Sequence, residues 1–322
     1  MSSLKSVLLF PISFLASIKI NDLGHDLFGG LVLSGGGLLL VKLTDSEGGK
    51  GLHEAGSVVG SGGISKGKHG LGELTGEQII AKALKTQGVE HGFGVVGIPV
   101  SGIAGAMMKE GMTYHGMRHE MPATYAAQAV SYLSGNVGVG LAVSGPGVLN
   151  AAGAYANAWS NRWPMLLLGG SYERSGHLQG FFQETDQLTA MRPYSKFAER
   201  VEDPYRLPIY IAEAIKKATH GTPGPAYLDL PGDVIQNSWD EDKVIWAPKV
   251  LSPRKTLSDP TDVESAIEAL KTAEQPLVIF GKGVNNADAA DEMREFVLYR
   301  LYYNIIHSLR MINVEGDRKH KK

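Results

Sequence analysis

Short apolar runs alternate with longer segments of helical periodicity between residues 75 and 170, and this alternation restricts the fold more than any other feature of the chain. The expected strands cover residues 92–99, 112–117, 137–143 and 165–170, and the expected helices cover residues 75–88, 101–109, 123–134 and 146–160. Strands that alternate with helices of this length pair in parallel. The continuous apolar run Val139–Val143 suits a central strand that is buried on both faces. We therefore expect an α/β fold in which a parallel sheet is flanked by helices on both faces.

Changes in composition divide the chain into segments. The glycine-rich residues 1–73 have the composition of a disordered extension, and residues 74–236 form the first domain, which ends with a helix over 204–219 and a strand over 225–230. Residues 237–260 are rich in proline and charge and are expected to be a linker. Residues 261–297 contain a helix, a strand and a glycine turn, which is the truncated βα start of a second parallel-sheet domain. Residues 298–322 form a tail without clear βα order.

The overall charge and the absence of cysteine exclude several classes of function. A formal net charge of -2 argues against a nucleic-acid-binding protein, because the basic cluster Arg318–Lys322 is confined to the end of the chain. Without cysteine there is no disulfide framework, thiolate nucleophile or cysteine-ligated metal, which fits an intracellular protein. The apolar run Val7–Ile18 is short for a membrane span; a weak export signal and a buried core segment both stay open.

Three predicted strand ends carry the residues of chemical interest. They are the turn Gly97–Pro99, the residue Glu120, and the turn Ser144–Gly147, which is followed by Asn150. In a parallel sheet these strand ends lie at one carboxyl edge, where open α/β sheets bind their ligands. Glu120 is the ionisable group of the three turns, and rigid apolar turns would shield it from water. It is either a first-turn carboxylate that interacts with the helix dipole or a group that shares a proton with a ring nitrogen.

Several motifs in one register resemble the amino-terminal pyrimidine-binding domain of thiamine-diphosphate enzymes. These motifs are Phe93–Val100, Arg118–Glu120 with Tyr125–Ala127, Ser144–Gly147 with Asn150, and Asn161–Pro164. The run Gly170–Arg174 is most similar to the branch that contains 2-hydroxyacyl-CoA lyases and oxalyl-CoA decarboxylases. The resemblance covers residues 74–297.

The resemblance implies a chemical role for Glu120 and a binding role for four neighbours. The carboxylate would hydrogen-bond N1′ of the aminopyrimidine of thiamine diphosphate and favour the imino tautomer, whose 4′ nitrogen removes the C2 proton of the thiazolium. The cofactor then provides the carbon nucleophile and electron sink. Gly97, Pro99, Pro146 and Asn150 would line the pyrimidine pocket. For Asn150 the alternative of an ordinary helix-start residue stays open.

A loop over residues 180–187 bears on the substrate. Its motif Phe182-Gln183-Glu184 resembles 2-hydroxyacyl-CoA lyases and acetolactate synthases, whereas oxalyl-CoA decarboxylases tend to carry Tyr-Glu-Glu. Phe182 and Gln183 would then face the reacting carbon, with Gln183 as a hydrogen-bonding group. The alternative is that Phe182 belongs to the core and Gln183 is a surface amide. The run Gly169–Arg174 favours the acyl-CoA branch over acetolactate synthase.

The resemblance also implies a reaction and an assembly. The reaction cleaves a 2-hydroxyacyl-CoA into formyl-CoA and an aldehyde one carbon shorter, as in fatty acid α-oxidation. Oxalyl-CoA decarboxylase and acetolactate-synthase-like activities stay open. The family's complete site forms between two subunits, so a homodimer, a homotetramer or a pairing with a full-length homologue is expected, in peroxisomes or the cytoplasm.

The sequence departs from the family pattern at two points. Met121 replaces the glutamine that usually follows the glutamate. The Gly-Asp-Gly motif, through which the family binds Mg²⁺ and the diphosphate, is absent, so we assign no metal ligand to this chain. We therefore expect the isolated chain to be incomplete or inactive. The alternative is a non-catalytic homologue or gene-model fragment that keeps a dimerisation surface. The chain does not end in a peroxisomal Ser-Lys-Leu signal.

Overall fold

The computed structural model describes residues 7–8, 72–273, 277–302 and 310–313. These residues fall into two compact units that divide between Lys255 and Thr256, with the strand Val7–Leu8 in the smaller unit. Most of the expected glycine-rich extension, and most of the apolar run Val7–Ile18, lie outside the described residues.

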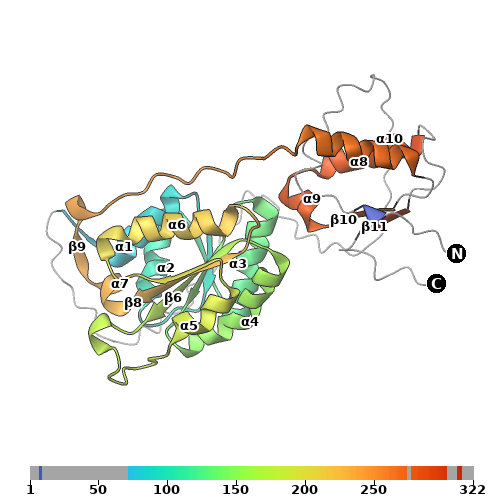
Figure 1. Ribbon diagram of the computed structural model, residues 1–322. Coiled ribbons are helices and arrows are strands. Elements are labelled where there is room, and N and C mark those ends of the chain that lie inside the picture. Colours follow the sequence, from blue (N-terminus) through green and yellow to red (C-terminus); the bar gives the residue numbers. More distant parts are fainter. Residues whose placement is uncertain (1–6, 9–71, 274–276, 303–309, 314–322) are drawn as a thin grey trace, which may run out of the picture. The chain divides into compact units, whose positions relative to one another are not determined.

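The larger unit is built on a six-stranded sheet in which every pairing is parallel (Figure 1). In spatial order its strands are β4 (Thr113–Gly116), β3 (His91–Gly94), β5 (Val139–Ala142), β6 (Met165–Ser171), β8 (Pro225–Pro231) and β7 (Phe197–Arg200). The helices are α1 (Gly76–Thr86), α2 (Ser101–Lys109), α3 (Glu120–Ser134), α4 (Pro146–Asn161), α5 (Gln187–Met191), α6 (Leu207–Thr219) and α7 (Gly232–Gln236). The expected α/β fold is confirmed.

Local sequence explains where several helices begin and end. Thr75 and Gln78 form a reciprocal capping box at the start of α1. Gly135 ends α3 with a left-handed backbone, φ +76°, which glycine adopts without strain. Pro146 is the first residue of α4, where its missing N–H costs nothing.

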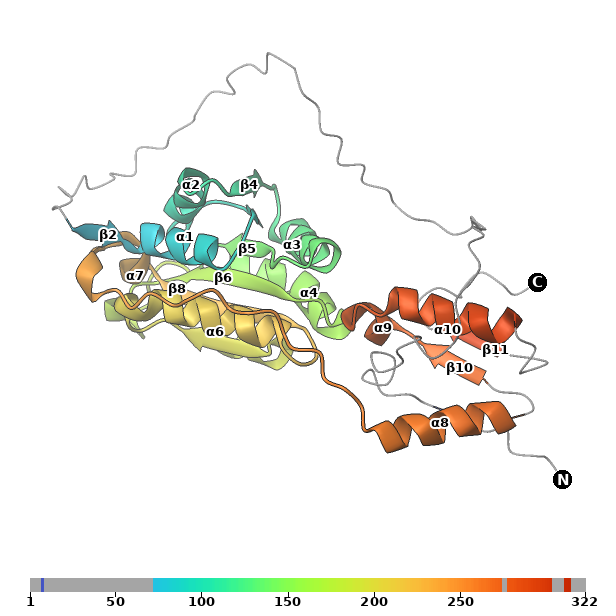
Figure 2. The ribbon, with the colours of Figure 1, turned by 90° about the horizontal axis from the view of Figure 1, so that it is seen from above.

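Two apolar layers hold the helices on the two faces of the sheet. On β6, Leu166 and Leu168 face the layer of α1, α2, α6 and α7, whereas Met165 and Leu167 face that of α3, α4 and α5. Figure 1 shows α6 on one side of β6 and β8 and α5 on the other. After a rotation of 90°, α3 and α4 are seen side by side (Figure 2). The strict alternation along β6, which is buried at every position, is what a strand covered on both faces requires.

The order of the strands places the candidate site. The chain passes from β3 outward to β4 and then returns to β5 on the other side of β3, so the connections diverge between β3 and β5. In open parallel sheets ligands bind outside the carboxyl ends of strands at such a point. The turns that follow β3, β4 and β5 are those that carry Gly97–Pro99, Glu120 and Ser144–Gly147.

The segment expected to be a linker, residues 237–260, begins with a strand. Strand β9 (Ser238–Asp240) pairs antiparallel with β2 (Glu73–Thr75). Farther on, the Gln87 side chain donates to the carbonyl of Pro248 and accepts from the N–H of Val250. The first part of this segment is therefore attached to the larger unit.

The smaller unit contains a three-stranded parallel sheet in the order β1-β10-β11. Its elements are β1 (Val7–Leu8), α8 (Pro260–Thr272), β10 (Leu277–Phe280), α9 (Lys282–Asn286), α10 (Ala290–Tyr302) and β11 (Arg310–Asn313). The expected helix, strand and turn of residues 261–297 are present. Helix α10 continues past residue 297. Strand β11 lies in the tail for which the sequence predicts no βα order, because a strand of four residues is too short to give a recognisable pattern.

Across residues 72–273, 277–302 and 310–313, no helix combines the length and the apolar character needed to cross a membrane.

Candidate active site

Glu120 lies where β4 gives way to α3 and is the first residue of that helix. The ring of His119 caps the helix by accepting the N–H of Met121 at 3.2 Å. Glu120 is 8% exposed, and its Oε2 accepts a hydrogen bond of 3.2 Å from Nδ2 of Asn150. Its Oε1 accepts no hydrogen bond from any residue that the structure describes. A largely buried carboxylate therefore has one oxygen paired and the other available to a ligand.

Asn150 reaches this carboxylate from α4, a helix that opens at a different strand end. The turn before it has Gly145 with φ +60°, and Pro146 follows as the first helical residue. Asn150 comes one turn later. The prediction that Glu120, Pro146 and Asn150 lie at one sheet edge agrees with this geometry. Their roles toward a ligand stay predictions.

The side chain of Val143 lies between two of the candidate glycines. A Cβ added at Gly97 would lie 2.7 Å from Cγ1 of Val143, and one at Gly147 would lie 2.5 Å from Cγ2. The same added atom at Gly147 would be 3.5 Å from Oε1 of Glu120. The backbone at these turns therefore comes close to Val143, and at Gly147 also to the carboxylate, because no side chain intervenes.

Pro99 occupies a different part of the edge. The Ile98–Pro99 peptide bond is cis, and the Pro99 ring packs against the backbone at the end of β6, where a Cβ on Gly170 would be 2.6 Å from the Cδ atom of the ring. Gly232, at the start of α7, also lies beside this ring. Pro99 is thus positioned by the end of β6 and the start of α7, beyond β5 in the strand order.

The Phe182–Gln183 segment is held against the same turn as Asn150. The Ser144 hydroxyl donates to the carbonyl of Gln183 at 3.1 Å, and Gln183 has a left-handed backbone with φ +58°. Phe182 is 77% exposed. The alternative in which Phe182 belongs to the core is therefore wrong, and its exposed ring is available at this edge.

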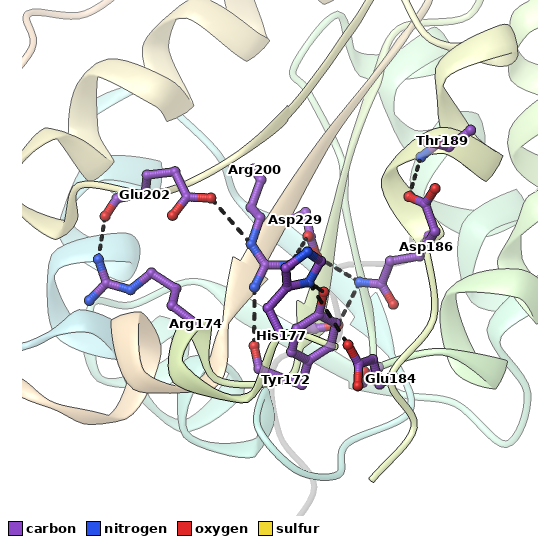
Figure 3. A network of polar contacts seen from close by, with 12 residues as sticks. Tyr172, Arg174, His177, Glu184, Asp186, Thr189, Arg200, Glu202 and Asp229 are labelled. Carbon is purple, nitrogen blue, oxygen red and sulfur yellow. Dashed lines mark hydrogen bonds and ion pairs between the residues drawn. The ribbon is translucent and has the colours of Figure 1, made fainter. Parts of the chain in front are cut away.

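Glu184 holds this loop in shape, a role that the motif alone did not indicate. Its carboxylate accepts hydrogen bonds from the N–H groups of Leu178 at 2.6 Å, Gly180 at 2.8 Å and Phe181 at 3.1 Å. These bonds, first that of Leu178, lower the pKa of Glu184. His177, 3.9 Å from the carboxylate, stacks on Tyr172 and shares a 2.7 Å hydrogen bond with its hydroxyl (Figure 3).

Two residues near the site have surroundings that local sequence does not predict. Met121, which departs from the family pattern, lies over α4, with its Cε 3.4 Å from where a Cβ on Gly153 would be. Gln187 is buried and bonds to Gly145, but a single glutamine in a loop gives no signal of burial. The parts of the chain that the structure describes contain no cluster of three or more His, Cys, Asp or Glu side chains placed to bind a metal ion.

Comparison with known proteins agrees with this fold. Residues 74–190 match the family model described as "Thiamine pyrophosphate enzyme, N-terminal TPP binding domain". Human 2-hydroxyacyl-CoA lyase 1 is 40% identical over 225 residues, which are 70% of this chain and 39% of the relative. The 2-hydroxyacyl-CoA lyase of Arabidopsis thaliana is 38% identical over 231 residues, 70% of this chain and 40% of the relative. Oxalyl-CoA decarboxylase of Escherichia coli K12 is 42% identical over 226 residues, 69% of this chain and 40% of the relative.

The chain thus spans about 40% of the length of these relatives. The matched residues 74–190 contain the parallel strands β3 to β6, the buried Glu120 and the turn that carries Asn150. Residues 74–190 of the larger unit thus match the N-terminal domain family of thiamine pyrophosphate enzymes, and the chain is similar to 2-hydroxyacyl-CoA lyases and oxalyl-CoA decarboxylases.

Proposed function

We propose that this chain supplies the pyrimidine-binding side of a thiamine-diphosphate-dependent carbon-carbon lyase. Its substrates would be 2-hydroxyacyl-CoA thioesters, and cleavage of the C1–C2 bond would release formyl-CoA and an aldehyde one carbon shorter. The names of the human and plant relatives and the Phe182-Gln183-Glu184 motif support this substrate class. The observation that carries the proposal is the buried carboxylate of Glu120, which has one oxygen paired with Asn150 and the other available.

The residues present fit the aminopyrimidine part of the cofactor. An aminopyrimidine is a flat ring that presents nitrogen atoms at its edge, so it requires an acceptor beside an unobstructed surface. Oε1 of Glu120 provides the acceptor, and no side chain projects from Gly147 beside that oxygen. Gly97 provides a second turn without a side chain on the other side of Val143. Glu120, Gly97, Pro99, Pro146 and Asn150 would together hold the ring.

Thiamine diphosphate, when bound, supplies the carbon nucleophile and the electron sink. The contribution of this chain is to hold and move a proton. Glu120 would hold a proton at the N1′ atom, and Asn150 would orient the carboxylate through its bond to Oε2. Burial keeps water from competing for this carboxylate. Phe182 would shield the reacting carbon from water, and Gln183 would hydrogen-bond the substrate.

The proposal extends to the assembly. Following the family resemblance, Mg²⁺ and the diphosphate would be held by a diphosphate-binding domain, and the site would form in a homodimer, a homotetramer or a pairing with a full-length homologue. Met121, Tyr125 and Leu149, on the first two turns of α3 and the first turn of α4, are between 40% and 44% exposed and offer apolar surface for such a pairing. An intracellular location, peroxisomal or cytoplasmic, goes with this assignment and can be checked by cell fractionation.

A second candidate is a non-catalytic homologue that keeps only the pyrimidine-facing and dimerisation surface. It is supported by Met121, which replaces the glutamine that usually follows the glutamate in the family. Within the catalytic proposal, decarboxylation of oxalyl-CoA is the closest alternative substrate chemistry, supported by the Escherichia coli relative. An acetolactate-synthase-like reaction is supported by the Phe182-Gln183-Glu184 motif alone.

A complementation experiment separates these possibilities. Human 2-hydroxyacyl-CoA lyase 1, with its own pyrimidine-facing glutamate changed to alanine, is mixed with this chain, thiamine diphosphate and Mg²⁺. The mixture receives a 2-hydroxyacyl-CoA, and formyl-CoA and the aldehyde are measured. We expect product from the mixture, and none when the added chain carries Glu120→Ala. The matched control is Glu173→Ala, which removes an exposed carboxylate at the same sheet edge.

Each outcome is decisive for one part of the proposal. Product that forms equally with the Glu120→Ala chain would remove Glu120 from the chemistry. Failure of the unmodified chain to restore product, when a co-purification assay shows that the two chains associate, would favour the non-catalytic homologue. Oxalyl-CoA and pyruvate, offered in parallel, test the two alternative reactions.

A further inference from the structure

Gln187 is a buried amide that connects the Gly145 turn of the candidate site to the strands β6 and β8. It is 2% exposed and is the first residue of the short helix α5. Its Oε1 accepts the N–H of Gly145 at 2.8 Å, in the turn that opens α4. Its Nε2 donates to the carbonyl of Gly170 at 2.8 Å on β6 and to Oδ1 of Asp229 at 2.7 Å on β8.

These partners allow one orientation of the amide. The N–H of Gly145 can only donate, so it requires the oxygen of Gln187 on its side. The carbonyl of Gly170 can only accept, so it requires the nitrogen. The side-chain amide cannot turn over without placing a donor against a donor and an acceptor against an acceptor. Its geometry is therefore fixed by groups that belong to two strands and a turn.

Asp229 on β8 stabilises this orientation by accepting a hydrogen bond from Nε2 of Gln187. The side chain is almost completely buried, and burial raises its pKa, while Arg200 and then Gln187 oppose that rise. Arg200 binds Oδ2 of Asp229 at 3.0 Å, donates to the carbonyl of Tyr172 and stacks over the Tyr172 ring (Figure 3). Asp229 thus has Arg200 at one oxygen and the amide of Gln187 at the other.

The turn that Gln187 binds is also the turn that carries both halves of the candidate site. Pro146 and Asn150 follow Gly145 on α4, and Asn150 binds Glu120. On the other side, Ser144 binds the carbonyl of Gln183. The Ser144 and Gln187 bonds therefore join the pyrimidine-facing turn to the loop that presents Phe182 and Gln183. Gln187 itself is buried behind this turn, so it acts through other residues.

We infer that Gln187 is a positioning residue, which fixes the Gly145 turn and with it the placement of Asn150 relative to the Phe182–Gln183 loop. The inference rests on the proposed function for its consequence, because it assigns a means of aligning the cofactor-facing and substrate-facing sides of that site. The hydrogen bonds themselves do not depend on any ligand, so they can be tested separately.

The test exchanges the chemical groups of the Gln187–Asp229 pair. Gln187→Glu places two carboxylates together. Asp229→Asn places a second amide nitrogen against that of Gln187, because Arg200 retains the oxygen on its own side. In each single variant we expect amide hydrogen exchange at Gly145 to accelerate at least tenfold. The double variant again pairs an amide with a carboxylate and leaves an acceptor facing Gly145, although the carbonyl of Gly170 loses its donor. Exchange at Gly145 should therefore be at least threefold slower than in either single variant.

Two further variants distinguish a local change at the Gly145 turn from a general loss of stability. Gln187→Met has similar volume but no polar group, and it should accelerate exchange at Gly145 more than at Val139–Ala142 of β5. The control Gln179→Met removes an exposed amide from the same loop and should leave Gly145 unchanged. Exchange at Gly145 that is unaffected in the single variants, that changes in step with β5, or that worsens additively in the double variant would overturn the inference.

The consequence for the site is measured by titration with thiamine diphosphate and Mg²⁺. Gln187→Met should weaken binding about tenfold and Gln179→Met should not. If the unmodified chain alone does not bind the cofactor, the same variants are compared by product formation in the complementation mixture. No product from the unmodified chain there contradicts the proposed function, while the exchange measurements still decide whether Gln187 positions the turn. Equal binding by Gln187→Met and the unmodified chain would overturn the link between Gln187 and the site.

Discussion

The close approach of α4 to Val143 makes a quantitative prediction for Gly147. A methyl group at this position would lie 2.5 Å from Cγ2 of Val143, well inside contact distance. Valine is stiff at χ1, so its methyl group cannot swing away as the end of a long side chain could. Forcing an extra methyl into such a site costs about 1–3 kcal/mol. Alanine in place of glycine in a helix recovers at most about 0.5–1 kcal/mol. We therefore expect Gly147→Ala to destabilise the chain by about 1–2 kcal/mol.

Gly153 provides the matched control, because it lies in the same helix and is exposed. A Cβ at this position meets only the flexible end of Met121, at 3.4 Å. Gly153→Ala should therefore stabilise the chain by about 0.5–1 kcal/mol. For a unit of this size, 1 kcal/mol corresponds to about 2–4 °C in Tm. The two alanine variants should shift the thermal midpoint, followed by circular dichroism, in opposite directions.

The cause is tested by adding Val143→Ala, which removes the opposing methyl groups. Gly147→Ala should cost about 1–2 kcal/mol less in the Val143→Ala background than in the unmodified chain. Urea denaturation of the four chains of this cycle measures that coupling. Equal effects of Gly147→Ala and Gly153→Ala, or a cycle without coupling, would refute the close packing of this turn.

Two further predictions concern Tyr114 and Glu184. The buried Tyr114 hydroxyl has no partner in the described residues, so Tyr114→Phe should stabilise the chain by about 1 kcal/mol in urea denaturation, and a loss of stability would contradict this. Burial also raises the pKa of Tyr114 to about 12. The stability linked to this raised pKa is therefore complete below pH 10 and is lost as the pH rises toward 12, and Tyr114→Phe should abolish this pH-dependent loss of stability. Glu184→Gln should accelerate amide exchange over Leu178–Phe181, whereas Glu173→Gln at the same edge should not. The N–H of Leu178 and its neighbours lower the pKa of Glu184. The amides of this loop should therefore stay protected from exchange above the ordinary carboxyl range and lose that protection as the pH falls through the lowered pKa. Protection from exchange that is independent of pH would refute this role.

The regular elements of the larger unit follow from the sequence because they depend on local pattern. Helix α2 spans Ser101–Lys109, as expected, and α4 begins at Pro146. The apolar run at Val139–Val143 predicts a central strand, and β5 lies between β3 and β6. Each of these features is set by the periodicity of neighbouring residues. The strand order β4-β3-β5-β6-β8-β7 is not set by local periodicity, because it depends on which strands pair across long connections.

The candidate site divides in the same way. Glu120 and Asn150 could be placed at one edge because both follow predicted strands, and they form a hydrogen bond. Gln187 could not be placed in the site from the sequence, because its burial results from partners that are distant in the sequence, at Gly145, Gly170 and Asp229. The strands β9 and β11 were missed because three or four residues carry too little periodicity. Amides buried by tertiary contacts and very short strands are therefore what local pattern does not reveal.

The role of Glu120 is tested most directly by nitrogen NMR of thiamine diphosphate labelled with ¹⁵N at N1′. The labelled cofactor and Mg²⁺ are titrated with the unmodified chain, with Glu120→Ala and with the control Glu173→Ala. NMR detects weak binding, so the measurement does not require a complete diphosphate site. We predict that the N1′ resonance moves in the direction of a protonated, hydrogen-bonded ring nitrogen with the unmodified chain and with Glu173→Ala. The same shift with Glu120→Ala, or no shift with the unmodified chain at saturating concentration, would contradict it.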